Sequence, residues 1–242
     1  MRIGATLVAL AAAAMLSAPA VAQTAEDLNA RCVNADRSIG NDQQVLACTR
    51  LIAMPGHSAQ SQAQYYNNRG NAFRADSEFG SAIADYDEAI RLDPNYANAF
   101  NNRGIANRAA GLADRAIADF TAALRINPEM ANAYGNRGSA FADRGDIARA
   151  LSDFSRAIEL NPDYAGAYNN RGNLYRQQRQ YDRAIADFGE AIRVNPRYAI
   201  AFNNRGRTYQ AMGDMTRALA DYEQAREIEP NNPNFQGFGM RR

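Results

Sequence analysis

The amino-acid sequence repeats with a period of 34 residues, and no other feature of the chain constrains its fold as strongly. The tripeptide Asn-Arg-Gly occurs five times, and its glycines are Gly70, Gly104, Gly138, Gly172 and Gly206. Proline follows the same period, at Pro94, Pro128, Pro162, Pro196 and Pro230. Five copies without an insertion indicate a repeat architecture, in which each small unit packs only against its neighbours.

Each unit contains the hydrophobic pattern of two short helices. When its proline is numbered 32, position 4 is aromatic in every unit, namely Tyr66, Phe100, Tyr134, Tyr168 and Phe202. Position 8 is the glycine, and position 11 is aromatic except at Asn107. Alanines at positions 20 and 27 flank an aromatic residue at position 24. Positions 4, 8 and 11 share one face of a helix, and positions 20, 24 and 27 share one face of another, so each unit is predicted to be a helical hairpin.

These positions together resemble the tetratricopeptide repeat family, and the likeness covers residues 63–232. The units are residues 63–96, 97–130, 131–164, 165–198 and 199–232. The resemblance implies an all-α, right-handed α-solenoid of five hairpins that binds another polypeptide, without naming that partner. The sequence departs from the family at position 7, where arginine replaces the usual leucine.

Residues 1–22 have the pattern of a bacterial secretory signal peptide. Arg2 precedes an apolar, alanine-rich run, and the triplet Ala20 to Ala22 ahead of Gln23 forms an A-x-A cleavage site. An uncleaved membrane anchor is the alternative, but small residues dilute the run and Pro19 follows it. The mature protein is therefore expected in the periplasm or outside the cell, without stable membrane insertion.

Residues 23–62 lack the tripeptide, yet they read as a degenerate hairpin that caps the repeats. Aligning this segment with the later units puts Cys32 at position 8 and Cys48 at position 24, which face one another inside a hairpin. We therefore predict a structural disulfide, which should contribute about 3 kcal/mol by closing a short loop. A reactive thiol pair or a metal site is less well supported, because the spacing is not C-x-x-C and the single histidine, His57, is distant. Residues 233–242 form a C-terminal tail.

Charge and motif content argue against several classes of function. All 27 basic residues are arginine, and loss of Arg2 with the signal peptide would leave 26 of them against 26 acidic residues. A nucleic-acid-binding protein would carry a clear positive excess, so no nucleic-acid partner is expected. The sequence has no catalytic motif, no cofactor signature and no set of metal ligands, so an enzyme is not expected.

Two charged positions border the apolar stripes of every unit. Position 7 is arginine (Arg69, Arg103, Arg137, Arg171 and Arg205), and position 23 is aspartate (Asp85, Asp119, Asp153, Asp187 and Asp221). Bidentate pairs between the helices of a hairpin, or between neighbouring repeats, would satisfy both charges. We interpret this ladder as structural rather than ligand-binding, because a charge at the edge of a core needs a partner to offset its desolvation.

Asparagines form a second ladder, beside the aromatic stripe of each first helix. Position 5 is Asn67, Asn101, Asn169 or Asn203, with Gly135 as the gap, and position 6 is Asn68, Asn102, Asn136, Asn170 or Asn204. In the family this helix lines the concave groove, and an amide offers the complement of a peptide group. The alternative is that these side chains bond local backbone or solvate the groove. Nearby arginines, at positions 12 and 9, are Arg74, Arg108, Arg176 and Arg207.

The sequence therefore predicts a scaffold that holds an extended polypeptide through backbone amides, with some arginine contacts to acidic side chains. The family's clamp for C-terminal carboxylates is not supported, because its basic positions are Asn, Gln, Gly or Ile here. The main rival is a homo-oligomeric structural protein of the cell envelope that associates through the ends of the solenoid. An enzyme is the least supported alternative.

Overall fold

The computed structural model describes residues 24–35 and 37–235, and these residues form twelve α-helices and one 3-10 helix, without a strand. The helices are α1 (Ala25–Val33), α2 (Asn41–Ala53), α3 (Ala59–Ala75), α4 (Phe79–Leu92), α5 (Ala97–Ala109), α6 (Ala113–Ile126), α7 (Ala131–Asp143), α8 (Ile147–Leu160), α9 (Ala165–Gln177), α10 (Tyr181–Val194), α11 (Ala199–Ala211) and α12 (Met215–Ile228). The 3-10 helix η1 spans Pro233–Phe235. Among the described helices, none is both long and apolar enough to cross a membrane. The predicted signal peptide, residues 1–22, lies outside the described residues.

Turn chemistry sets the helix ends. Within three of the hairpins the connecting turn contains a glycine in the left-handed conformation, at Gly111, Gly145 and Gly213 with φ near 80°. Each second helix ends just before the residue that precedes the repeat proline. In α6, for example, Asn127 ahead of that proline is extended, with φ −132° and ψ 96°, because a following proline disfavours the helical conformation.

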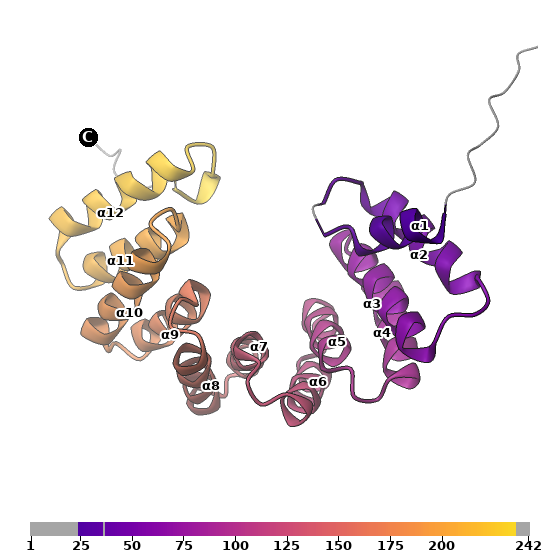
Figure 1. Cartoon of the computed structure of the whole chain (residues 1–242). Helices are drawn as coiled ribbons and strands as arrows, with labels where there is room; N and C mark the ends of the chain where they lie inside the picture. The colour runs from indigo at the N-terminus through magenta and orange to yellow at the C-terminus, as the bar shows by residue number, and fades with distance from the viewer. Residues whose placement is uncertain (1–23, 36, 236–242) are drawn as a thin grey trace, which may run out of the picture.

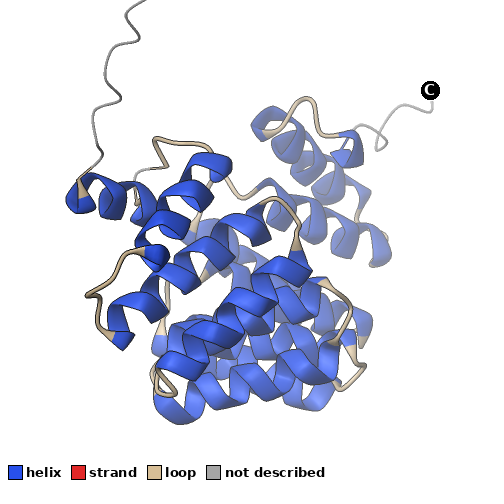
Figure 2. Cartoon of the chain, turned by 90° about the vertical axis from the view of Figure 1, so that its right-hand side faces the viewer, coloured by secondary structure: helices blue, strands red, loops and turns tan. Residues whose placement is uncertain are grey.

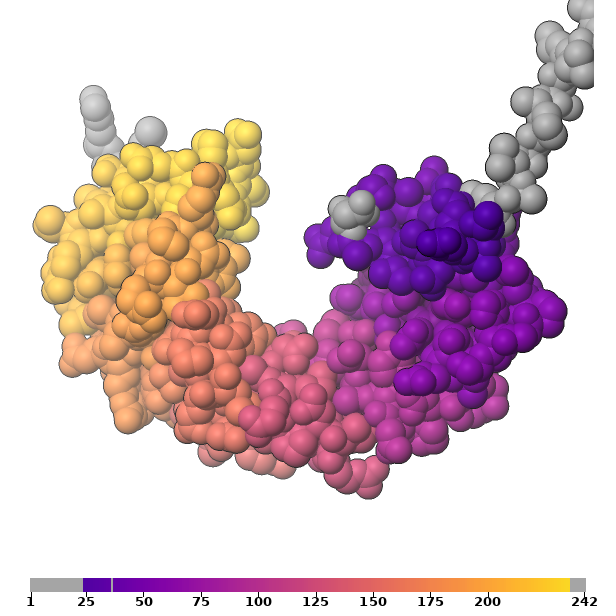
Figure 3. All heavy atoms as spheres, viewed as in Figure 1, coloured from indigo at the N-terminus to yellow at the C-terminus, as the bar shows by residue number. Residues whose placement is uncertain are grey.

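Consecutive hairpins stack side by side into an all-helical solenoid, which curves into an open arc (Figure 1). The view turned by 90° shows only helices and connecting loops among the described residues (Figure 2). The first helices α5, α7 and α9 lie on the inner side of the arc, and α6, α8 and α10 lie on the outer side (Figure 1). The arc encloses a wide hollow, which is open between the first described helices, α1 and α2, and the last hairpin, α11–α12 (Figure 3).

The core of each hairpin places a large ring against a residue without a side chain. Phe120 of α6 is fully buried, and a Cβ added to Gly104 of α5 would lie 2.6 Å from its Cε1 atom. Tyr86 of α4 has the same relation to Gly70 of α3, at 2.8 Å. Glycine at position 8 therefore permits the close approach of the two helices, which a larger residue would prevent.

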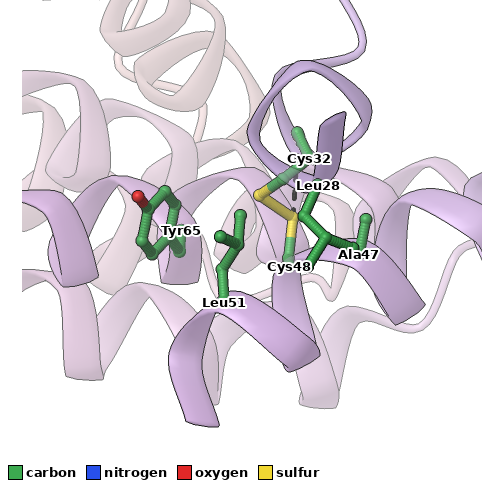
Figure 4. Packing of buried hydrophobic residues seen from close by; sticks show 6 residues of the cluster. All are labelled: Leu28, Cys32, Ala47, Cys48, Leu51 and Tyr65. Carbon is green, nitrogen blue, oxygen red and sulfur yellow. Dashed lines mark hydrogen bonds between the residues drawn. A yellow bond between two sulfur atoms is a disulfide. The ribbon is translucent and has the colours of Figure 1, made fainter. Parts of the chain in front are cut away.

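The N-terminal residues form the capping hairpin α1–α2, and Cys32 and Cys48 are joined in it by a disulfide (Figure 4). Their Cα atoms are 4.8 Å apart and both side chains are fully buried. Leu28 and Leu51 pack beside them, and Tyr65 of α3 belongs to the same cluster. Gln44 supports the hairpin through a 2.9 Å hydrogen bond that its Nε2 donates to the carbonyl oxygen of Cys32. Among the described residues this unit packs only against the hairpin that follows it, and the disulfide links its two helices.

Local contacts determine how the repeat region begins and ends. Helix α3 begins at Ala59, four residues ahead of the repeat boundary, because the hydroxyl oxygen of Ser58 accepts a hydrogen bond from the backbone N–H of Ser61. At the other end, Phe235 folds back and is 4% exposed, against Ala199 and Ala225 of the last hairpin. The first residues of the C-terminal tail thus cover apolar surface that a sixth repeat would otherwise bury.

Candidate functional site

The five Asn-Arg-Gly tripeptides lie on the first helices of the hairpins, α3, α5, α7, α9 and α11. For the central repeats these are the helices on the inner side of the arc, facing the hollow (Figures 1 and 3). The polar side chains on this side are therefore the candidate functional groups of the chain. Two ladders involve these helices: the asparagines lie on them, and their position-7 arginines pair with aspartates of the second helices.

Every position-7 arginine forms a bidentate pair with the position-23 aspartate of its own hairpin. Nε and Nη2 each donate to a carboxylate oxygen at distances between 2.6 and 3.1 Å, in the pairs Arg69–Asp85, Arg103–Asp119, Arg137–Asp153, Arg171–Asp187 and Arg205–Asp221. The aspartates are only 5–6% exposed. The hydrogen bond from Arg137 to Asp153 raises the pKa of the Arg137 guanidinium above its ordinary value, although burial acts in the opposite direction.

In Arg103, Arg137 and Arg171 the remaining nitrogen, Nη1, donates to a side chain of the preceding repeat, at a position that the sequence did not indicate. Nη1 of Arg137 donates to the Thr121 hydroxyl at 3.2 Å, and Nη1 of Arg171 donates to the Ser155 hydroxyl at 3.0 Å. The acceptors stand at position 25, where a small hydroxyl or carboxyl side chain could have suggested this role. Each guanidinium also lies 5.4–5.8 Å from the position-4 ring of its own helix. In Arg103, Arg137 and Arg171 all three guanidinium nitrogens therefore donate within the protein.

The asparagine ladder is partly internal, which corrects the expectation that both of its positions line the groove. The position-5 residues Asn67, Asn101, Asn169 and Asn203 are only 4–8% exposed. Nδ2 of Asn102 donates to Oδ1 of Asn67 in the preceding repeat at 2.9 Å. The same bond joins Asn136 to Asn101 at 3.1 Å and Asn204 to Asn169 at 2.9 Å. The position-5 amides therefore tie neighbouring repeats together, and Asn204, itself 7% exposed, also belongs to this internal set.

The position-6 asparagines Asn68, Asn102, Asn136 and Asn170 are only half-buried, whereas the position-5 asparagines are buried. Asn170 differs from Asn102 and Asn136, because the residue at position 5 of the preceding repeat is Gly135. The Tyr164 ring occupies that space, 2.8 Å from where a Cβ of residue 135 would lie. In place of a bond to the preceding repeat, Asn170 accepts one from Asn169 at 3.3 Å. Its own amide N–H groups are thus not used between repeats.

The four arginines expected near the groove have different surroundings. Arg108 is neutralised within the protein, because its Nε donates to Asp143 of the next repeat at 2.6 Å. Arg176 reaches only a neutral amide, donating from Nη2 to Oδ1 of Asn173 at 3.2 Å. Arg207 is exposed. Burial of Arg176 lowers the pKa of its guanidinium, and the positive charge of Arg207 lowers that pKa further.

Arg74 lines a polar cavity of about 590 Å³ where the capping hairpin meets the first helices of the repeats. The cavity is bordered by Asn34 and Gln44 of the cap, by Asn68 and Asn71 of α3, and by Asn102 of α5. It therefore joins the cap to the position-6 asparagines.

Within residues 24–35 and 37–235, no His, Cys, Asp or Glu side chains gather in a group that could hold a metal ion. The position-23 aspartates are held by arginines, and His57 packs edge-on against Tyr65 with 5.1 Å between ring centroids. The arrangement offers amide and guanidinium groups for binding. That the protein is not an enzyme stays a prediction.

Comparison with protein families finds two matching models. One, described as "Tetratricopeptide repeat", matches residues 165–198 and 199–232. The other, described as "TPR repeat", matches residues 70–111 and 138–178. Together the matched segments span more than half of the chain. A comparison with curated protein sequences finds no match.

Solved structures with the same fold include several bacterial repeat proteins. A crystal structure of MamA is 28% identical, with a TM-score of 0.59, and the alignment covers 66% of this chain and 94% of that one. YrrB, described as a TPR protein with an unusual peptide-binding site, is 26% identical with a TM-score of 0.57, covering 78% of this chain and 95% of that one. PilF of Pseudomonas aeruginosa shows the fold alone, at 18% identity and a TM-score of 0.73, covering 88% and 96%.

Proposed function

The chain belongs to the tetratricopeptide repeat family, and we propose that it is a protein-interaction scaffold that holds an extended polypeptide along its inner helices. The observation that carries this proposal is the row of half-buried position-6 amides on the first helices of the first four repeats. In the central repeats these helices lie on the inner side of the arc (Figure 1). YrrB, described as having a peptide-binding site, supports the general role.

The amides have hydrogen-bonding capacity to spare for such a ligand. An asparagine side chain has two N–H donors and an oxygen that can accept two bonds. Asn102 and Asn136 each commit one N–H to the preceding repeat, which leaves the second N–H and the oxygen. Asn170 commits neither N–H to the preceding repeat. Groups that bind the backbone of an extended chain make recognition tolerant of the partner's sequence.

Export completes the proposal. The pattern of residues 1–22 supports a cleaved signal peptide, and a disulfide in the cap is typical of proteins that work in an oxidising compartment. We expect the mature N-terminus to be Gln23, and intact mass of protein recovered from the envelope of the producing bacterium measures it. Retention of residues 1–22 would contradict this part of the proposal.

The function is tested with a labelled neutral peptide of alternating Ala and Gln, whose binding is followed by fluorescence anisotropy. Asn170→Ala removes one position-6 amide without stranding a partner in the preceding repeat, so affinity should fall roughly three- to ten-fold. The free energy of unfolding should change little, because the bond lost within the protein is the long, 3.3 Å one from Asn169. The matched control is Asn101→Ala, at the buried position 5. It should lower the free energy of unfolding by about 1 kcal/mol with little effect on affinity. Unchanged binding by Asn170→Ala, or equal losses of affinity in the two variants, would contradict the proposal.

A second candidate, self-association through the end of the solenoid, has one specific observation in its favour. Ile200, Met212, Met215 and Leu219 of the last hairpin are all 39–47% exposed, which is unusual for large apolar side chains close together in sequence. Truncation at Asn232 would not test this candidate cleanly, because it uncovers the surface that Phe235 buries. The candidate is tested by sedimentation of a Met212→Gln/Met215→Gln variant. If the protein self-associates through this end, the variant should become monomeric.

A further inference from the structure

We propose that the groove selects polypeptides that carry acidic side chains, and that Arg74 and Arg176 are the residues that bind them. The inference rests on the proposed function, because it names the chemistry of the same partner. It also separates these two arginines from Arg108, which stands at the same position 12 of another repeat.

Register along the solenoid explains the difference between the three arginines. Arg108 reaches Asp143, which lies 35 residues further along the chain on the next first helix. The residues 35 positions after Arg74 and Arg176 are Ala109 and Ala211. These two arginines therefore lack the carboxylate that neutralises Arg108.

The bonding of the Nε atoms agrees with this register. Nε of Arg108 donates to Asp143 at 2.6 Å. Nε of Arg74 and Nε of Arg176 are both buried and have no hydrogen-bond partner. A buried donor without an acceptor is costly, and a charged donor more so. A carboxylate from a bound partner would satisfy Nε and one terminal nitrogen at once, in the bidentate geometry that the position-7 pairs already show.

The surroundings of Arg74 favour an anion over a cation. The described residues that line its cavity include Arg37, Asn68 and Asn102, and none of the lining residues is Asp or Glu. On α3, Asn71 accepts a hydrogen bond from the buried Tyr86 hydroxyl at 2.8 Å, which keeps its amide beside the cavity. With a volume of about 590 Å³, the space can take a carboxylate side chain together with the backbone that carries it.

Arg176 has a similar preference, produced by a second cation. Its Nη2 is held by Asn173, a neutral group. Burial and the charge of Arg207 lower the pKa of Arg176, so the uncharged form is favoured relative to an isolated arginine. A carboxylate bound here would offset both effects. Arg74 and Arg176 lie on the first and fourth repeats, with the asparagine row between them, so a single extended chain that follows the row meets both.

The test uses two labelled twelve-residue peptides, one alternating Ala and Glu and the other alternating Ala and Gln. The wild-type protein should bind the Glu peptide roughly ten-fold more tightly at low salt, and added salt should reduce this difference. Arg74→Gln and Arg176→Gln should each weaken binding of the Glu peptide roughly ten-fold without changing binding of the Gln peptide. Arg108→Gln is the matched control and should leave both affinities unchanged, because Asp143 already occupies that guanidinium.

Four outcomes would overturn the inference. The first is equal affinity of the wild type for the two peptides, and the second is a loss of affinity for the Glu peptide in Arg108→Gln as large as in Arg74→Gln. The third is unchanged binding of the Glu peptide by both Arg74→Gln and Arg176→Gln, and the fourth is binding of inorganic phosphate that depends on these arginines while the Glu peptide binds no more tightly than the Gln peptide. Binding of the Gln peptide that depends on Asn170 would then leave the proposed function standing. If neither peptide binds, the proposed function fails together with the inference.

Discussion

The Arg137–Asp153 pair at the centre of the solenoid lets the structural role of the Arg–Asp ladder be measured. Replacing Arg137 by leucine, the residue usual at position 7 of the family, removes a guanidinium that donates to both carboxylate oxygens, at 2.8 and 2.9 Å. The Asp153 side chain is only 8% exposed, so water cannot fully replace these bonds. We expect Arg137→Leu to destabilise the protein strongly, and Arg137→Leu/Asp153→Ala to cost much less than the sum of the two single changes.

The magnitude follows from the burial of the two partners. Removing one member of a buried, hydrogen-bonded ion pair costs about 3–5 kcal/mol, chiefly because it strands the other charge. Arg137→Leu should fall in that range, and it also loses the bond to Thr121. Asp153→Ala should cost less, since the Arg137 side chain is 19% exposed and can reach solvent. The coupling energy between the two sites should therefore be at least about 2 kcal/mol.

Urea denaturation followed by far-ultraviolet circular dichroism measures the four proteins of this cycle. Urea is preferred to guanidinium chloride, because the chloride salt would screen the ion pair. Because a repeat protein can unfold one part at a time, the unfolding transitions are fitted with a model of interacting neighbouring repeats and not with a two-state model. Arg108 and Asp143 supply the control cycle, because their side chains are 42% and 47% exposed. Their coupling should stay below about 1 kcal/mol.

Equal coupling energies in the two cycles would refute the reasoning, because burial would then make no difference to the ion pair. So would additive single changes at Arg137 and Asp153. That result would mean that Asp153, once unpaired, finds water or another donor at little cost.

Three further predictions concern the core, the alkaline limit and the cap. Gly104→Ala should destabilise the protein by about 1–3 kcal/mol, since the new methyl group would lie 2.6 Å from a buried ring. Gly80→Ala, with open space around it, is the control and should stabilise the protein by up to about 1 kcal/mol. Melting temperatures that shift in the same direction in the two variants would contradict this. Burial raises the pKa of Tyr86 from 10.0 to about 12, so its neutral form favours the folded state, and this contribution, complete below pH 10, should be lost as the pH rises towards 12. The loss amounts to at most about 2.7 kcal/mol, and Tyr86→Phe should remove it from the pH dependence of stability; an unchanged alkaline slope would show that burial does not control this hydroxyl. Reducing the bond between Cys32 and Cys48 should cost about 3 kcal/mol locally, so hydrogen exchange should rise in α1 and α2 before α7 and α8, and a uniform rise would argue against independent repeats.

The sequence by itself determined the features that repeat within one hairpin. The 34-residue period, together with an aromatic stripe opposite Gly and Ala, specified pairs of helices, and the family models and the solved structures agree with that prediction. Arg137 and Asp153 lie 16 residues apart, and so do Cys32 and Cys48. Contacts at this separation can be inferred from the sequence, because the two helices of a short hairpin must lie antiparallel and their facing positions follow from helical periodicity.

Only the tertiary structure decided the contacts between hairpins. Those contacts depend on the rotation from one repeat to the next, which arises from side-chain packing at each interface and not from any local pattern. The sequence alone therefore predicts the same role for the two asparagine positions, whereas the structure buries Asn101 and leaves Asn170 half-buried. For the same reason the sequence alone predicts one role, near the groove, for both Arg108 and Arg176. Asp143, 35 residues after Arg108, neutralises that arginine, whereas the residue 35 positions after Arg176 is an alanine. This difference affects the charge of the two sites only because the solenoid brings neighbouring first helices together.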